Sequence, residues 1–320
     1  MKLIFMGTSE FAVPSLARLV DDGYEVAGVF TQPDKPAGRG RHVHAPPVKE
    51  FAISRGIALH QLASIKDSEP AREVMSGVNP DAVVVAAYGK ILPEWMLRIP
   101  RLGCINVHAS LLPKYRGAAP INWAIANGDD ATGVSIMRMD AGMDTGPVYA
   151  ARATTIGRTE TAPELSRRLA QMGAELLAET LPQIASGGIQ ATPQDDREAT
   201  YAPMLKREDG LIDLRMPARE IANRVRGFQP WPGSYTTFRG HRLIIWRSSE
   251  TSAESGQSAA ASCASLTIIG LDKSGVTVSC AGGTMLHIEE LQLEGRRRMA
   301  ARDVVNGLRL TIGDRITDME

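Results

Sequence analysis

The sequence has little that would commit it to a disulfide framework, a metal or a membrane. Its 320 residues contain only three cysteines, at 104, 263 and 280, which lack zinc-ligand spacing and cannot all pair within the chain. Such usage favours a reducing compartment. No apolar run approaches the roughly 20 residues that cross a bilayer, and polar residues after Met6 interrupt the N-terminal apolar stretch before a signal-peptide core forms. We therefore expect a cytoplasmic protein without a membrane-spanning segment.

Two further absences narrow the function. The 36 basic residues balance the 36 acidic ones, so no global field recruits nucleic acid, and any such binding must depend on local patches. The turn after the first predicted strand reads Gly-Thr-Ser-Glu-Phe, residues 7–11. It lacks the Gly-x-Gly-x-x-Gly that brings backbone close to a pyrophosphate, which excludes a dinucleotide cofactor of that type.

Strands and helices alternate through the first two thirds of the chain. With 43% hydrophobic residues, the chain is large enough for two domains with sizeable cores. The apolar periodicity predicts strands over Lys2–Met6, Glu25–Thr31, Ala82–Ala87, Gly103–His108 and Thr132–Met139, and helices over Phe11–Val20, Pro47–Arg55 and Ala162–Ala185. This pattern is typical of a doubly wound, Rossmann-like parallel α/β sheet, whose site lies at the carboxyl ends of the strands.

The character of the chain changes after about residue 202. A helix is predicted over Pro217–Phe228 with its arginines mostly pointing outward, and residues 248–262, rich in Ser and Ala, are typical of a mobile loop. Short strands are predicted at Ser234–Phe238, Arg242–Arg247, Ser265–Leu271, Val276–Cys280 and Met285–Leu291. They favour a small β-barrel of the oligonucleotide-binding (OB-like) type. We expect domains at 1–205 and 206–320.

The most informative segment is NVHASLLPKYRG, residues 106–117, together with Asp144 in DAGMDTG, residues 140–146. Asn106 and His108 are two apart, so on a strand their side chains share one face. An Asn amide can donate to the oxyanion of a tetrahedral intermediate, and a His can take a proton near neutral pH. A carboxylate can orient that His. Together these groups could move an acyl group onto an amine.

An Asn-x-His pair on a strand is also common as a purely structural feature, with both side chains hydrogen-bonded and inactive. Here Pro113, Gly117 and Pro120 keep the chain irregular after the strand. Loops at strand ends are where sites are usually built. The composition of this loop therefore favours the catalytic interpretation.

The run HASLLPKYRG, residues 108–117, resembles the signature of the folate-dependent formyltransferases. The resemblance implies that Asn106, His108 and Asp144 are catalytic: the first two would polarise a formyl oxygen, and Asp144 would keep His108 in its working state. The co-substrate would be 10-formyltetrahydrofolate, and no metal would be required. VAAYGKILP, residues 85–93, also matches and would contact the pterin largely through backbone groups. The expected folate-binding residues are Ser110, Leu111, Leu112, Pro113, Tyr88, Gly89, Ile91 and Leu92.

A long loop after the second predicted strand bears on the acceptor. Lys35, Arg39, Arg41 and Lys49 against Asp34 give it a net charge of +3. A solvated surface loop would also explain this composition, whereas a metal site at its His-Val-His lacks completing ligands. The stretch QPDKPAGRG resembles the loop by which methionyl-tRNA formyltransferases engage the acceptor arm of initiator tRNA. Lys35, Arg39 and Arg41 are therefore the expected tRNA contacts, led by Arg39.

Two other segments are less specific indicators of function. The pattern FQPWPG, residues 228–233, occurs where that family joins its catalytic domain to its smaller C-terminal domain. The run Arg296-Arg297-Arg298 is either a solvated patch or a phosphate contact.

We therefore predict transfer of a formyl group from 10-formyltetrahydrofolate to the α-amino group of methionine on initiator methionyl-tRNA, for translation initiation, by a monomer. Either His108 or a water ordered by Asp144 would take the amine proton. A formyltransferase for an amino sugar nucleotide or a small amine would keep the same three residues, but it would not need the basic loop. A non-catalytic RNA-binding protein would not need the three residues together.

Overall fold

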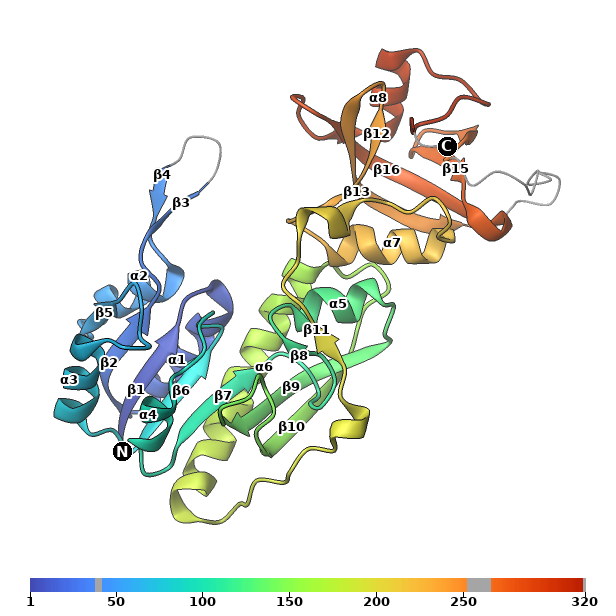
Figure 1. Ribbon diagram of the computed structural model, residues 1–320. Coiled ribbons are helices and arrows are strands. Elements are labelled where there is room, and N and C mark those ends of the chain that lie inside the picture. Colours follow the sequence, from blue (N-terminus) through green and yellow to red (C-terminus); the bar gives the residue numbers. More distant parts are fainter. Residues whose placement is uncertain (38–41, 252–265, 319–320) are drawn as a thin grey trace. The chain divides into compact units, whose positions relative to one another are not determined.

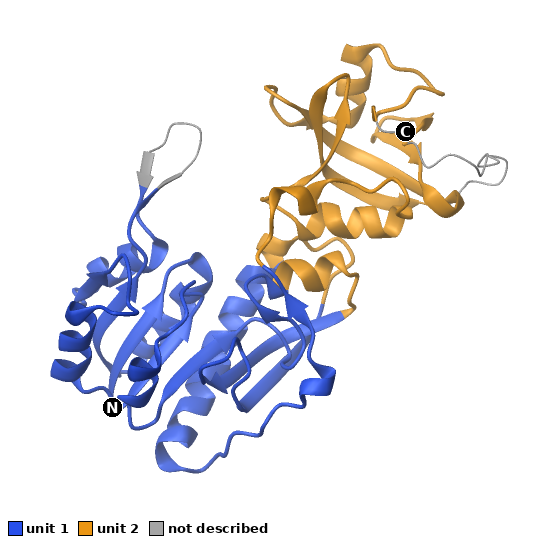
Figure 2. Ribbon diagram, in the orientation of Figure 1, with its two compact units in different colours: residues 1–120, 131–155, 165–203 blue, residues 121–130, 156–164, 204–320 orange. Residues whose placement is uncertain are grey.

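The computed structural model describes residues 1–37, 42–251 and 266–318. They form two compact units, coloured blue and orange in Figure 2. Unit 1 comprises residues 1–120, 131–155 and 165–203, and unit 2 comprises residues 121–130, 156–164 and those from 204 onward. Two short segments that precede residue 165 therefore belong to the C-terminal unit, which the sequence pattern did not reveal.

Unit 1 is built around a seven-stranded sheet of spatial order β10-β9-β7-β6-β1-β2-β5 (Figure 1). The strands are β1 (Lys2–Gly7), β2 (Glu25–Thr31), β5 (Leu59–Gln61), β6 (Ala82–Ala86), β7 (Cys104–His108), β9 (Ala131–Arg138) and β10 (Val148–Thr155). Five neighbouring strands of this sheet, β7, β6, β1, β2 and β5, are parallel. The expected α/β fold is confirmed, because these short Val- and Ile-rich runs are buried on both faces.

The direction of β9 differs from the expected parallel sheet. It runs antiparallel to β7, with His108 opposite Ser135 and Ile105 opposite Arg138. The parallel prediction is wrong here because the connection 109–130 does not recross the sheet, so β9 begins at the edge where β7 ends. β10 then pairs antiparallel with β9. Its side chains alternate between half-buried and exposed, so it carried too little apolar signal to be predicted.

Helices pack on the sheet of unit 1. They are α1 (Val13–Asp21), α2 (Pro47–Ser54), α3 (Glu69–Val78), α4 (Glu94–Arg98) and α6 (Ala162–Ser186). Met75 of α3 and Met96 of α4 join Cys104 in one buried cluster. Gly173 lets α6 approach the other face, because a Cβ there would lie 2.7 Å from Cγ1 of Val107. Residues that alternate with Val107 on β7 therefore face away from α6.

Two short ladders extend unit 1. β3 (Lys35–Ala37) pairs antiparallel with β4 (His42–His44), placing Lys35 opposite His44. The expected long loop is therefore partly strand. β8 (Arg116–Gly117) pairs in parallel with β11 (Tyr201–Ala202), which holds the loop after β7 against a segment about 85 residues later in the chain.

Unit 2 contains an antiparallel sheet of order β12-β13-β16-β15-β14, with β17 beside β16. The strands are β12 (Ser234–Phe238), β13 (His241–Thr251), β14 (Ile268–Leu271), β15 (Val276–Ser279), β16 (Met285–Leu293) and β17 (Met299–Ala300); the helices are α5 (Pro120–Ala126), α7 (Ala218–Gly227) and α8 (Ala301–Leu308). The antiparallel strands expected for the C-terminal domain are confirmed, while their closure into an OB-like barrel stays a prediction. β13 is longer than predicted, so residues 248–251, expected in a mobile loop, are strand, and 252–262 lie outside the described residues.

Not all arginines of α7 point to solvent. Arg226 is half-buried and donates from Nη1 to the carbonyl oxygens of Gly157 and Glu160, both at 3.1 Å. Burial lowers the pKa of the Arg226 guanidinium. The prediction of outward arginines is wrong at this position, because Arg226 tethers segment 156–164 to α7. Along the described ranges, no helix combines the length and apolar character needed to cross a bilayer.

Candidate active site

Asn106 and His108 lie at the carboxyl end of β7, on the face turned away from α6. Only 8% of Asn106 and 5% of His108 is exposed. Strand alternation explains the shared face, and the parallel sheet explains why loops from neighbouring strands meet at this edge. Cys104 shares the face, but burial raises the pKa of its thiol to about 12, so it is a poor nucleophile.

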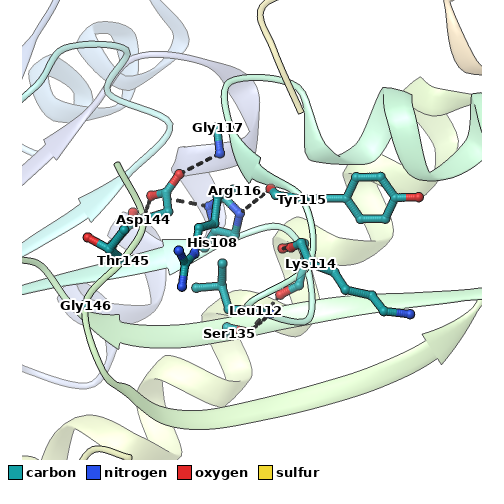
Figure 3. A network of polar contacts seen from close by, with 12 residues as sticks. His108, Leu112, Lys114, Tyr115, Arg116, Gly117, Ser135, Asp144, Thr145 and Gly146 are labelled. Carbon is teal, nitrogen blue, oxygen red and sulfur yellow. Dashed lines mark hydrogen bonds and ion pairs between the residues drawn. The ribbon is translucent and has the colours of Figure 1, made fainter. Parts of the chain in front are cut away.

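The surroundings of His108 assign its tautomer (Figure 3). Its Nε2 lies 3.1 Å from the main-chain oxygen of Tyr115, and its Nδ1 lies 3.7 Å from Oδ1 of Asp144. A carbonyl oxygen only accepts, so Nε2 must carry hydrogen and donate. In the neutral ring Nδ1 is then unprotonated. The edge of the imidazole that can exchange a proton is therefore the edge that faces Asp144.

Asp144 reaches the same point from the loop after β9. Its Oδ2 accepts from the backbone N–H of Gly117 at 2.9 Å, and its Oδ1 accepts from Nδ2 of Asn106 at 3.4 Å. Its backbone φ of 54° lies in the left-handed region, which is uncommon for a residue other than glycine. Asn106, His108 and Asp144, predicted from separate motifs, are thus brought together by the fold.

The loop after β7 is held by its own polar groups. The Ser110 hydroxyl donates to the carbonyl oxygen of Lys114 at 2.6 Å, and the Ser135 hydroxyl donates to that of Ser110 at 2.7 Å. Ser135 also accepts from the N–H of Leu112. Ser110 is fully buried, so its side chain organises the loop, whereas Leu111, Leu112 and Pro113 are partly exposed.

The second predicted folate segment follows β6, the strand next to β7. The side chains of Tyr88 and Leu92 are buried in the core, and burial raises the pKa of the Tyr88 phenol to about 12. The carbonyl oxygen of Tyr88 accepts from Thr8 and Gln32, and that of Gly89 also accepts from Gln32. Ile91 is 74% exposed. The Ile91 side chain is therefore accessible to a ligand, whereas Tyr88, Gly89 and Leu92 can contact a ligand only through main-chain groups.

Of the three expected tRNA contacts, the structure describes one. Lys35 is exposed and donates to the side-chain oxygen of Gln32 at 3.0 Å. Arg39 and Arg41 lie outside the described residues. Lys49 is paired with Asp34 at 2.6 Å. Hydrogen bonds from Gln61 and then Lys49 lower the pKa of the Asp34 carboxyl. Because the Lys49 ammonium and the Asp34 carboxylate form an ion pair, their opposite charges largely offset one another within the predicted loop.

Two functional candidates were missed by the sequence reasoning. Arg116 is 2% exposed and donates to Gln194 and Asp196, while Gln194 donates to the backbone next to the Asp144 side chain. Arg116 was visible in the motif, but Gln194 lies 78 residues further on and carries no local signal. No cluster of three His, Cys, Asp or Glu side chains fit to hold a metal ion occurs in the part of the chain that was described.

Known proteins resemble the chain over nearly its whole length. The family description "Formyl transferase" matches residues 1–181, and "Formyl transferase, C-terminal domain" matches residues 204–309. The chain is 47% identical to the methionyl-tRNA formyltransferase of Geobacter metallireducens over 99% of this chain and 98% of that protein. It is 46% identical to that of Koribacter versatilis, with 99% and 98% covered.

Solved structures show the same fold at lower identity. WlaRD, a sugar 3N-formyl transferase solved in the presence of dTDP and 5-N-formyl-THF, gives a TM-score of 0.67 at 16% identity, covering 93% of this chain and 99% of that one. The N-formyltransferase of Helicobacter canadensis, in complex with folinic acid and dTDP-3-aminofucose, gives 0.65 at 17%, covering 90% and 98%. Together with the family matches along both parts of the sequence, these findings show that the chain belongs to the formyl transferase family.

Proposed function

We propose that this protein transfers a formyl group from 10-formyltetrahydrofolate to the α-amino group of methionine on initiator methionyl-tRNA. The observation that carries the proposal is the convergence of Asn106, His108 and Asp144, with the Asp144 carboxylate 3.4 Å from the Asn106 amide and 3.7 Å from the imidazole. The near full-length similarity to methionyl-tRNA formyltransferases favours this acceptor. The cytoplasm, where translation begins, is the expected compartment.

The residues at the carboxyl edge of β6 and β7 fit a folate. Ile91 is exposed, and Leu111, Leu112 and Pro113 are partly exposed on the neighbouring loop, which provides apolar surface for a flat ring. Main-chain groups of residues 88–92 supply polar atoms in fixed positions. We propose that these two loops hold the pterin and present the formyl carbon to His108.

In the proposed reaction, the amine attacks the formyl carbon and a tetrahedral intermediate forms. Asn106 donates from Nδ2 to the developing oxyanion, a type of contact typically worth about 10²- to 10³-fold in rate. Because Nε2 of His108 donates to Tyr115, Nδ1 takes the proton from the attacking nitrogen. His108 then returns that proton to the leaving folate nitrogen as the carbon–nitrogen bond breaks. Asp144 stabilises the imidazolium in the interval.

We propose that the acceptor is chosen away from this centre, by Lys35, Arg39 and Arg41 and by residues 206–320. This assigns residues 1–205 as the catalytic domain and residues 206–320 as a domain that contributes to tRNA binding. The protein is proposed to act as a monomer. An amino-sugar acceptor, as the names of the solved relatives suggest for those proteins, is disfavoured by the much higher identity to methionyl-tRNA formyltransferases.

The test is formyl transfer from 10-formyltetrahydrofolate to methionyl initiator tRNA, compared with free methionine and with an amino sugar nucleotide. We expect the charged tRNA to be used far more efficiently, and equal turnover of the acceptors would reject the assignment. Asn106→Ala and His108→Ala should each lower kcat by at least about 10²-fold in a folded protein. Arg39→Ala should mainly raise KM for tRNA and leave the KM for folate unchanged.

A further inference from the structure

Arg116, which is buried, and Gln194, which is partly buried, form a polar chain that ends on the Asp144 backbone. The guanidinium of Arg116 donates from Nε and Nη2 to Oε1 of Gln194, at 3.1 and 2.9 Å. The Gln194 amide nitrogen donates to the carbonyl oxygens of Asp144, at 2.9 Å, and Gly146, at 2.6 Å. Arg116 also reaches Asp196 at 2.8 Å. Both N–H groups of the Gln194 amide therefore have an acceptor.

The chemistry of the partners sets the orientation of this amide. A guanidinium only donates, and a carbonyl oxygen only accepts. Gln194 can satisfy both sides only with its oxygen toward Arg116 and its nitrogen toward the loop. A flipped amide would place the Gln194 nitrogen against the guanidinium donors of Arg116, and the Gln194 oxygen against two carbonyl oxygens. Arg116 therefore makes Gln194 a directed donor to residues 144 and 146.

The loop that Gln194 holds contains a residue in an unfavourable backbone conformation. The left-handed φ of Asp144 costs on the order of 1 kcal/mol or more. Gln194 binds the carbonyl group of that same residue, and Gly117 binds its carboxylate. The segment 115–117 thus contacts the centre directly at two points, Tyr115 at His108 and Gly117 at Asp144 (Figure 3). Arg116 reaches it through Gln194.

We propose that Gln194, oriented by Arg116, is a positioning residue that fixes Asp144 against His108 during formyl transfer. The proposal rests on the proposed role of Asp144. Gln194 touches neither reacting atom, so its loss acts through the placement of the carboxylate. A misplacement of about 1 Å at a reacting centre can cost about 10²-fold.

The first test is Gln194→Glu. Glutamate keeps the size of the side chain and can pair with Arg116, but it presents an oxygen to the carbonyl groups of Asp144 and Gly146. We expect kcat to fall by about 10-fold or more, with the KM for 10-formyltetrahydrofolate within about threefold of wild type and a cooperative thermal unfolding transition that shows the variant to be folded. The matched control is Gln183→Glu on α6, whose amide also donates to a backbone carbonyl, that of Glu179, but on the surface. It should leave kcat unchanged.

A double-mutant cycle with Asp144→Asn separates positioning from packing. If Gln194 acts through Asp144, Gln194→Glu should add little further loss in the Asp144→Asn background, because coupled residues are not additive. Additive losses, or wild-type kcat in Gln194→Glu while Asp144→Asn is impaired, would overturn the positioning role and leave the proposed function intact. Wild-type turnover in Asp144→Asn would overturn both the proposed role of Asp144 and the positioning role of Gln194.

Arg116→Met and Arg116→Lys provide an independent check if Gln194→Glu does not fold. Methionine keeps bulk but removes the donor that orients Gln194, whereas lysine keeps a donor. We expect kcat to be lower for methionine than for lysine, by about 10-fold. Equal kcat for the two folded variants would overturn the orienting role of Arg116.

Discussion

Replacing Asp144 by asparagine tests the central electrostatic contact with almost no change of shape. To keep the hydrogen bond from the Gly117 N–H, the new side chain must turn its oxygen toward Gly117. Its NH₂ group then faces Nδ2 of Asn106 and Nδ1 of His108, where the carboxylate oxygen stood. A donor therefore replaces the negative charge that would stabilise a protonated His108.

The magnitude follows from the separation. Two unit charges about 4 Å apart attract by about 4 kcal/mol at an effective dielectric constant of about 20. The pair here is 3.7 Å apart, and the Asp144 side chain is 17% exposed, so water screens part of this attraction. We expect a loss of about 3 kcal/mol in the transition state, which corresponds to a fall in kcat of about 10²-fold.

The assay is formyl transfer to methionyl initiator tRNA at saturating co-substrate, with thermal unfolding measured in parallel. Asp140→Asn is the matched control in the same loop. Both hydrogen bonds to Asp140, from Gly142 and Thr145, go to one oxygen, Oδ1, which asparagine retains. We expect that variant to keep wild-type kcat. The reasoning is refuted if Asp144→Asn folds and turns over within about threefold of wild type, or if Asp140→Asn loses as much.

Two further predictions address burial and backbone strain. Burial raises the pKa of the Cys104 and Cys280 thiols to about 12, so thiolate forms only as the pH approaches that value; in a Cys263→Ser variant at pH 8, neither thiol should react with a disulfide reagent until the protein is unfolded. Rapid labelling of the native variant would contradict this. Gly117→Ala should lower the free energy of unfolding by at least about 1–3 kcal/mol and also reduce kcat, because φ is 123° and a Cβ would lie 2.6 Å from the Ala202 oxygen. Gly187 also has a positive φ, but a Cβ there would meet no neighbouring atom. Gly187→Ala should therefore lower the free energy of unfolding measured in urea without a loss of kcat.

Local sequence patterns predicted most of the secondary structure of the fold. Short apolar runs and amphipathic segments predicted β1, β2, β6, β7 and the long helix α6 within one or two residues at most ends. A short continuous apolar run is typical of a strand buried on both faces, and a period of 3.6 is typical of a helix with one buried face. The same patterns predicted the strand β9 within one residue but not its direction, and they missed β10. The direction of β9 depends on whether its connection recrosses the sheet, and no local property of residues 131–138 encodes that path.

The candidate active site was also predictable only in part. Motif spacing identified Asn106, His108 and Asp144 as candidates, and it placed the first two on one strand face; their catalytic role stays a prediction. Spacing could not reveal that the Tyr115 carbonyl binds Nε2 of His108 and so leaves Nδ1 for proton transfer. It also could not reveal Gln194, since a glutamine in an irregular segment has no distinguishing pattern.

The sequence by itself determined the α/β class, the strand that carries Asn106 and His108, and the similarity that points to formyl transfer, because these depend on residue types and on neighbours along the chain. Only the tertiary structure decided which atoms meet. The approach of Asp144 to His108 and the bridge from Arg116 to Gln194 join residues 36 and 78 positions apart, and such contacts arise from the order and direction of strands in the sheet. Contacts between residues far apart in the sequence depend on the topology of the sheet. Local propensity limits the possible topologies but does not select one of them.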